Sequence, residues 1–66
     1  MKKHKDYYYT TKLYDVASRN NSTLVKYYHW FIRNKEGEVL QQSESMIEGK
    51  ENAEYDCIEH INEYYY

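Results

Sequence analysis

The hydrophobic and polar positions divide the chain into a strand-like part followed by a helix-like part. Residues 7–16 and 23–33 are rich in Tyr, Thr, Val, Phe and Ile, which suit the pleated surface of a sheet. Residues 38–43 form a weaker apolar segment around Val39 and Leu40. This pattern predicts three β-strands, over 7–16, 23–33 and 38–43.

Clusters of turn-forming residues separate these segments. Residues 18–22 read Ser-Arg-Asn-Asn-Ser, and Asn and Ser tolerate tight local hydrogen bonding. Residues 34–37 read Asn-Lys-Glu-Gly, and we expect Gly37 to supply the positive φ of a hairpin turn. Since both connections are short, the three strands are predicted to be antiparallel neighbours, a β-meander.

The period of the apolar positions changes after Gly49. From Lys50 to Tyr64, apolar side chains recur at steps of three and four, at Ala53, Cys57, Ile58, Ile61 and Tyr64 or Tyr65. This spacing predicts a helix with one apolar face. The expected fold is α+β, a three-stranded antiparallel β-meander followed by one C-terminal helix packed on one sheet face (β-β-β-α). It forms a single domain over 1–66, in which residues 1–6 are a frayed basic lead.

The length and composition exclude several classes of protein. A chain of 66 residues has room for one small core, so dinucleotide-binding, P-loop and barrel enzymes are excluded. One Cys cannot form an internal disulfide. No apolar run has the length of about 18 residues that would span a membrane, and no signal peptide follows the first lysines. We therefore expect a cytoplasmic protein without contact to membranes.

The segment predicted over 23–33 carries large apolar side chains on both faces. We expect Trp30 and Ile32 to lie beneath the helix. One helix covers only one face of a sheet, so an apolar strip would stay open on the other face, where we place Val25, Tyr27, His29 and Phe31. An exposed strip of this kind is typical of an interface. The alternative is that the N-terminal Tyr residues or the C-terminal tail fold over it.

Charge is distributed unevenly along the chain. Residues 1–33 carry a net charge of +5 and residues 34–66 a net charge of −7. One interpretation is that the two halves neutralise each other in the fold. The other is an acidic helix face that recognises a basic protein, as in an inhibitor of a nucleic-acid-binding or defence protein from a phage or mobile element. The glutamates of that face are Glu48, Glu51, Glu54, Glu59 and Glu63.

Tyrosines gather at both ends of the chain. Tyr64, Tyr65 and Tyr66 are either interface anchors, a role that Tyr often has, or a helix end that folds back onto the sheet. Tyr7, Tyr8 and Tyr9 follow several lysines, a weak version of a nucleic-acid-binding pattern. The sequence pI of about 5.9 argues against nucleic acid as the partner.

No residue pattern predicts catalysis. Cys57 and His60 lie three positions apart, but Cys57 is on the apolar face of the predicted helix, where Cys behaves as a small hydrophobe. The three His residues do not have the spacing of a metal site. We expect no catalytic residue, cofactor, metal or small-molecule substrate, and hence no enzyme.

One stretch of the chain resembles a known family. Residues 28–44 read YHWFIRNKEGEVLQQSE, and this segment resembles the repeat of the YegP-like family, small bacterial domains of unknown function. Tyr28, Trp30 and Ile32 match its first strand, residues 37–40 its Gly-Glu-Val-Ile segment, and residues 43–44 its Ser-Glu pair. Ile58 and Ile61 match its helix.

The resemblance covers about residues 28–62 and has local departures. Glu36 stands where the family has a turn Asn, and Ser45 and Met46 stand where it has a Gly-aromatic pair. The resemblance implies a three-stranded sheet with one helix, present as tandem repeats or as a homodimer, and no catalytic residues. Together with the residue patterns it predicts a small non-enzymatic module that binds another protein or itself, most simply as a homodimer.

Overall fold

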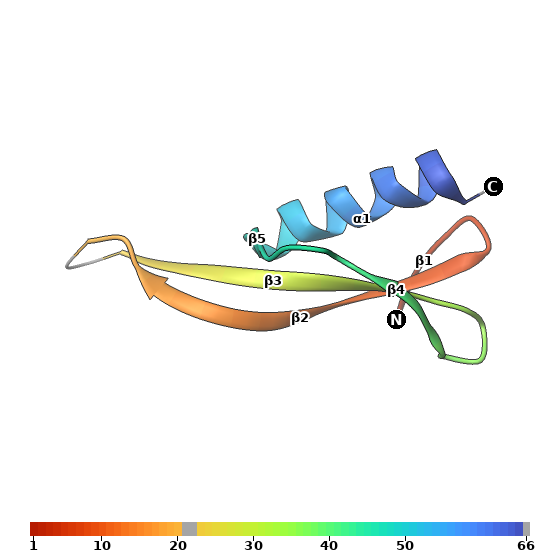
Figure 1. Ribbon diagram of the computed structural model, residues 1–66, viewed down its shortest axis with the longest axis horizontal. Coiled ribbons are helices and arrows are strands. Elements are labelled where there is room, and N and C mark those ends of the chain that lie inside the picture. The colour runs from red at the N-terminus through yellow and green to blue at the C-terminus, as the bar shows by residue number, and fades with distance from the viewer. Residues whose placement is uncertain (21–22, 66) are drawn as a thin grey trace.

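An antiparallel sheet with one helix on its upper side forms the fold (Figure 1). The computed structural model describes residues 1–20 and 23–65. The elements are β1 (Lys2–His4), β2 (Tyr7–Ser18), β3 (Leu24–Arg33), β4 (Val39–Gln42), β5 (Ile47–Glu48) and α1 (Lys50–Tyr64). The strands lie in the order β1-β2-β3-β4, and β5 also pairs with β3. The predicted meander and C-terminal helix are confirmed, with two short strands in addition.

The frayed lead is a wrong prediction, because β1 pairs with β2. Lys2 lies opposite Tyr9, and Lys5, with φ 56°, makes the tight turn between the strands. Lys2 Nζ is 2.7 Å from Glu54 Oε2, and His4 Nε2 is hydrogen-bonded to an Asn62 side chain at 2.7 Å. The polar composition suggested fraying, but the polar partners come from α1, far away in the sequence.

The predicted hairpin turn at 34–37 is confirmed. Gly37 has φ 87°, and its N–H donates to the Asn34 carbonyl at 3.0 Å. The Asn34 side-chain oxygen accepts hydrogen bonds from the N–H groups of Glu36 and Glu38, each at 3.0 Å. Arg33 Nη1 donates to the Gly37 carbonyl at 2.9 Å, so the turn is held from both sides.

The turn predicted at 18–22 is described only in part. The Arg19 N–H donates to the Thr23 carbonyl at 3.0 Å, and the Asn20 side chain accepts the Thr23 N–H at 3.0 Å. Asn21 and Ser22 lie outside the described residues.

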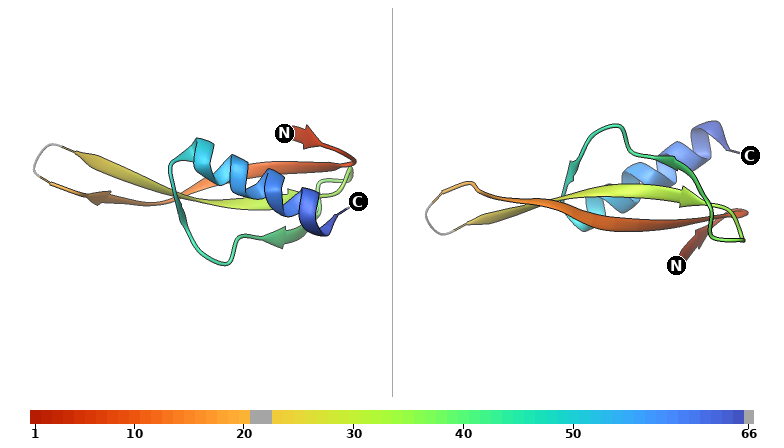
Figure 2. Two further views of the ribbon diagram at one scale, coloured as in Figure 1. Left: turned by 90° about the horizontal axis from the view of Figure 1, so that it is seen from above. Right: turned by 60° about the horizontal axis from the view of Figure 1, so that its bottom comes forward.

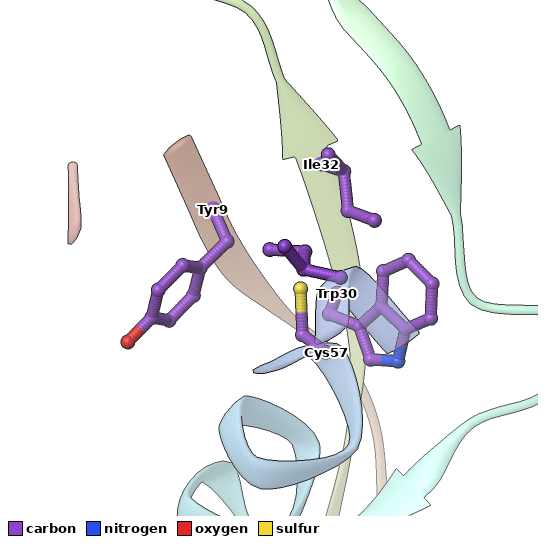
Figure 3. Close-up of a cluster of buried hydrophobic side chains, with 5 residues drawn as sticks. Tyr9, Trp30, Ile32 and Cys57 are labelled. Carbon is purple, nitrogen blue, oxygen red and sulfur yellow. The ribbon is translucent and has the colours of Figure 1, made fainter. Parts of the chain in front are cut away.

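The hydrophobic core lies between α1 and one face of the sheet. The buried residues of α1 are Ala53, Cys57 and Ile61, which repeat at the predicted interval of four. The central cluster consists of Tyr9, Trp30, Ile32, Cys57 and Ile61. Figure 3 shows Cys57 of α1 directed at the sheet, near Trp30 and Tyr9. The placement of Trp30 and Ile32 beneath the helix is therefore confirmed.

Strands β2 and β3 extend well beyond the helix and form an arm, defined here as residues 13–18 and 24–27 (Figure 1). The Gly49 N–H, just before α1, donates to the Lys26 carbonyl at 2.9 Å, so the helix begins at the base of the arm. The molecule measures 43 × 21 × 18 Å, with a radius of gyration of 12.9 Å, against about 11 Å for a compact domain of this length. The arm accounts for the elongated shape.

The arm bears apolar side chains that the helix does not cover. Tyr14 is an extra residue in β2, because the pairing with β3 shifts between Leu13 and Asp15, as in a β-bulge. The exposed apolar residues of the arm are Leu13, Tyr14, Val16 and Leu24. The elongated part of the molecule therefore also exposes apolar side chains to solvent.

Candidate interaction surface

The sheet face opposite α1 is the first candidate surface. Directly opposed residues on neighbouring strands share a face, and the pairs Lys12–His29, Thr10–Phe31 and Phe31–Gln42 lie on the face away from the helix. Figure 2 shows α1 on one side of the sheet only. We call this surface the open face; it consists of Tyr8, Thr10, Lys12, Tyr14, Asp15, Tyr27, His29, Phe31, Arg33 and Gln42.

A shallow hollow of about 390 Å³ lies in the open face, with Lys12, Tyr14, His29 and Phe31 among its walls. The Tyr14 and His29 rings meet edge to face, with centroids 4.6 Å apart. His29 Nδ1 is hydrogen-bonded to Ser43 Oγ at 2.6 Å, so the imidazole is fixed on its other side. The hollow therefore has aromatic walls that are already oriented.

The predicted apolar strip is confirmed in part. Tyr27, His29 and Phe31 lie on the open face and are half-buried. Val25 is 7% exposed, so its prediction as open surface is wrong. Alternation assigns Val25 to a face of the strand, but it does not determine how far that position is exposed.

The alternative was that the N-terminal Tyr residues or the C-terminal tail fold over the apolar strip, and the structure tests this in part. Tyr7 and Tyr65 pack against the core cluster on the helix side, with ring centroids 4.8 Å apart. They therefore do not fold over the open face. Tyr66 lies outside the described residues.

The acidic helix face is partly neutralised by the basic half of the chain. Arg19 Nη2 lies 2.7 Å from Glu48 Oε1, and Lys2 pairs with Glu54. The hydrogen bond from Lys2 to Glu54 and the Glu54 charge raise the pKa of Lys2 above its ordinary value. Among the described residues, Glu51, Glu59 and Glu63 are exposed and take part in no ion pair. Neutralisation within the fold is thus found for Glu48 and Glu54, and recognition of a basic protein by the acidic face stays a prediction.

The C-terminal tyrosines have different environments. Tyr65 folds back, and its hydroxyl donates to Gln41 Oε1 at 2.6 Å; burial, and then the nearby Tyr7, raise the pKa of Tyr65. Tyr64 is 62% exposed and contacts the His60 ring at a centroid distance of 4.6 Å. Tyr65 therefore belongs to the fold, and Tyr64 is available to a partner.

Cys57 is a core residue and not a nucleophile. Its side chain is fully buried, and burial, with smaller contributions from Asp56 and Glu54, raises the pKa of the thiol to about 12. At neutral pH the thiol is protonated, whereas the thiolate is the reactive form. Residues 1–20 and 23–65 contain no group of three or more His, Cys, Asp or Glu side chains that could hold a metal ion.

The pattern of apolar positions gave no indication of a buried polar contact at Ser43. This side chain is 4% exposed, and its oxygen accepts the Trp30 N–H at 3.2 Å in addition to its bond with His29. The Ser43 N–H donates to the Trp30 carbonyl at 3.0 Å. Ser43 thus continues the pairing of β3 just after β4 ends.

Comparison of the chain with protein-family models, with curated proteins and with solved structures gives no match. The resemblance to the YegP-like family therefore stays a prediction. In the part of the chain that the structure describes, no helix is both long enough and apolar enough to cross a membrane.

Proposed function

We propose that the protein is a small non-enzymatic interaction module that forms a homodimer through its open face. The supporting observation is the hollow with Tyr14, His29 and Phe31 in its walls, on the face that α1 does not cover. Aromatic side chains are enriched in the centre of protein interfaces. The α+β fold and this aromatic surface are both those expected of a small protein that acts by binding.

The charges of the open face favour a second copy as the partner. Lys12 and Asp15 flank Tyr14 on the same strand and face. A two-fold interface must be self-complementary, and a two-fold axis near Tyr14 would place Lys12 of one copy across from Asp15 of the other. The aromatic centre would be buried between these charges.

The small core gives a second reason for association. Among the described residues only seven hydrophobic side chains are buried, and a domain below about 70 residues rarely gains more than about 3–5 kcal/mol from its core. Packing the open faces together would bury apolar area that a single copy leaves in water. Such burial adds about 25 cal/mol per Å².

Light scattering on the purified protein tests this proposal. We expect a mass near twice 8.2 kDa that persists at high salt, because apolar burial is insensitive to screening. Phe31→Asp places a charge in the hollow and should yield a monomer with an unchanged circular dichroism spectrum. Tyr55→Asp is the matched control, since Tyr55 is 67% exposed but lies on α1. A wild-type monomer at high protein concentration, or equal dissociation by both variants, would contradict the proposal.

The inhibitor alternative has less support. Two of its five glutamates, Glu48 and Glu54, are already in ion pairs within the chain. The nucleic-acid alternative depends on the N-terminal lysines, and one of them, Lys2, is in an ion pair with Glu54. A cytoplasmic location and the absence of catalysis stay predictions.

A further inference from the structure

A second hollow lies on the helix side of the molecule, and Gln42 is the one described residue that the linings of the two hollows share. The second hollow has a volume of about 360 Å³, and it runs between the last turns of α1 and the connection from β4 to β5. An adjoining hollow of about 530 Å³ shares Gln41, Glu44, His60 and Tyr64 with it. Together they form a groove, which we call the ring groove.

Three aromatic rings form a row along one wall of the ring groove. The Trp30 and His60 centroids are 5.1 Å apart, and those of His60 and Tyr64 are 4.6 Å apart. The indole is held in place because Trp30 Nε1 donates to Asp56 Oδ2 at 2.7 Å. Trp30 is thus anchored at the buried end of the row, and the exposed ring of Tyr64 lies at the other end.

Carboxylates border this row from two sides. Glu44 comes from the connection after β4, while Asp56 and Glu63 come from α1. Among the described residues, no Lys or Arg lines either of the two hollows. Low-dielectric walls around charges of one sign focus the field on the groove, so a cation is favoured there.

We propose that the ring groove binds an arginine side chain from a basic segment of another protein. A guanidinium is planar, stacks on aromatic rings and donates hydrogen bonds in a fork that matches carboxylates. It would lie against His60 and Tyr64 and donate to Glu44 and Glu63. An ammonium group lacks the planar stacking surface, so lysine is the weaker ligand.

The arginine must come from a different protein. The chain contains two arginines, and both are engaged: Arg19 pairs with Glu48, and Arg33 bonds to Thr10 and to the Gly37 carbonyl. A second copy would have to break these contacts to supply the side chain. The ring groove is therefore proposed for a partner other than the second copy at the open face.

The single tryptophan makes the groove directly observable. Trp30 is the chain's one Trp, so its fluorescence and its indole N–H resonance both report on this wall. Titration with the acetylated, amidated peptide Gly-Arg-Gly-Arg-Gly should give a saturable change in both signals. The corresponding lysine peptide should bind at least about threefold more weakly.

Charge-matched variants identify the carboxylates involved. Glu44→Gln and Glu63→Gln should each raise the dissociation constant of the arginine peptide about fivefold, because each removes a charge-assisted hydrogen bond. Glu59→Gln removes the same charge from an exposed position of α1 outside the groove lining, and should leave affinity nearly unchanged.

Two outcomes would overturn the proposal. One is the absence of saturable shifts in either signal up to about 10 mM peptide, a concentration above the dissociation constant of weak sites. The other is an equal loss of affinity in Glu59→Gln, which would indicate attraction to overall charge. The monomeric Phe31→Asp variant should bind the peptide normally, so failure of dimerisation and failure of the groove can be told apart.

Discussion

Trp30→Ala should leave the protein largely unfolded at 25 °C. The indole is 3% exposed, contributes to the central cluster and holds Asp56 through its N–H. Replacing a buried Trp with Ala costs about 3–5 kcal/mol, which is as large as the whole stability expected for a domain of this size. The removed contacts join β3 to α1, so no other element can replace them.

Far-ultraviolet circular dichroism during urea unfolding measures this effect. All variants must be compared at one protein concentration, because self-association adds to apparent stability. Trp30→Phe keeps an aromatic ring and loses the bond to Asp56, so we expect an intermediate loss. Tyr64→Ala, at an exposed ring of the same groove, should change the midpoint little. A cooperative transition of Trp30→Ala near the wild-type midpoint would show that the core is not organised around this residue.

Ser43→Ala should destabilise the protein by about 1–3 kcal/mol, the cost of leaving a buried donor without a partner. The Ser43 oxygen accepts the Trp30 N–H and bonds to His29. Alanine keeps the backbone bond to the Trp30 carbonyl but leaves the Trp30 N–H without this acceptor. The loss should also free the His29 ring at the open face.

Ser45→Ala provides the comparison, since Ser45 is exposed and lies two residues further along the same connection. Surface substitutions of this kind change stability by less than about 0.5 kcal/mol. Midpoints of chemical denaturation distinguish the two variants. Equal midpoints would mean that water replaces the Ser43 oxygen at no cost.

The elements that local patterns predict well are those held together by short-range features. The helix begins after Gly49 and extends to Tyr64, as the spacing of Ala53, Cys57 and Ile61 indicated. The turn closed by Gly37 was also predictable, because an Asn and a positive-φ Gly are local requirements. The alternation of side chains along residues 23–33 likewise placed Trp30 and Phe31 on opposite faces of the sheet.

The features that could not be predicted depend on partners far away in the sequence. β1 is stabilised by Glu54 and Asn62, and β5 consists of two residues beside Tyr27 and Tyr28. The bulge at Tyr14 reverses the alternation within β2. The ring groove was not predictable for the same reason. Its walls come from β3, the connection after β4, and α1, which are far apart in the sequence.

The arm has a consequence for how the protein opens. Its strands extend beyond α1 in Figure 1, and its contacts with β5 and Gly49 are at its base, at Tyr27 and Lys26. A two-stranded ribbon alone is at best marginally stable in water. Amide hydrogens of the arm should therefore exchange through local opening, while those of β3 under the helix wait for global unfolding. The protein would then contain two cooperative units of unequal stability. The less stable unit is free to change its twist against another chain without any loss of the core.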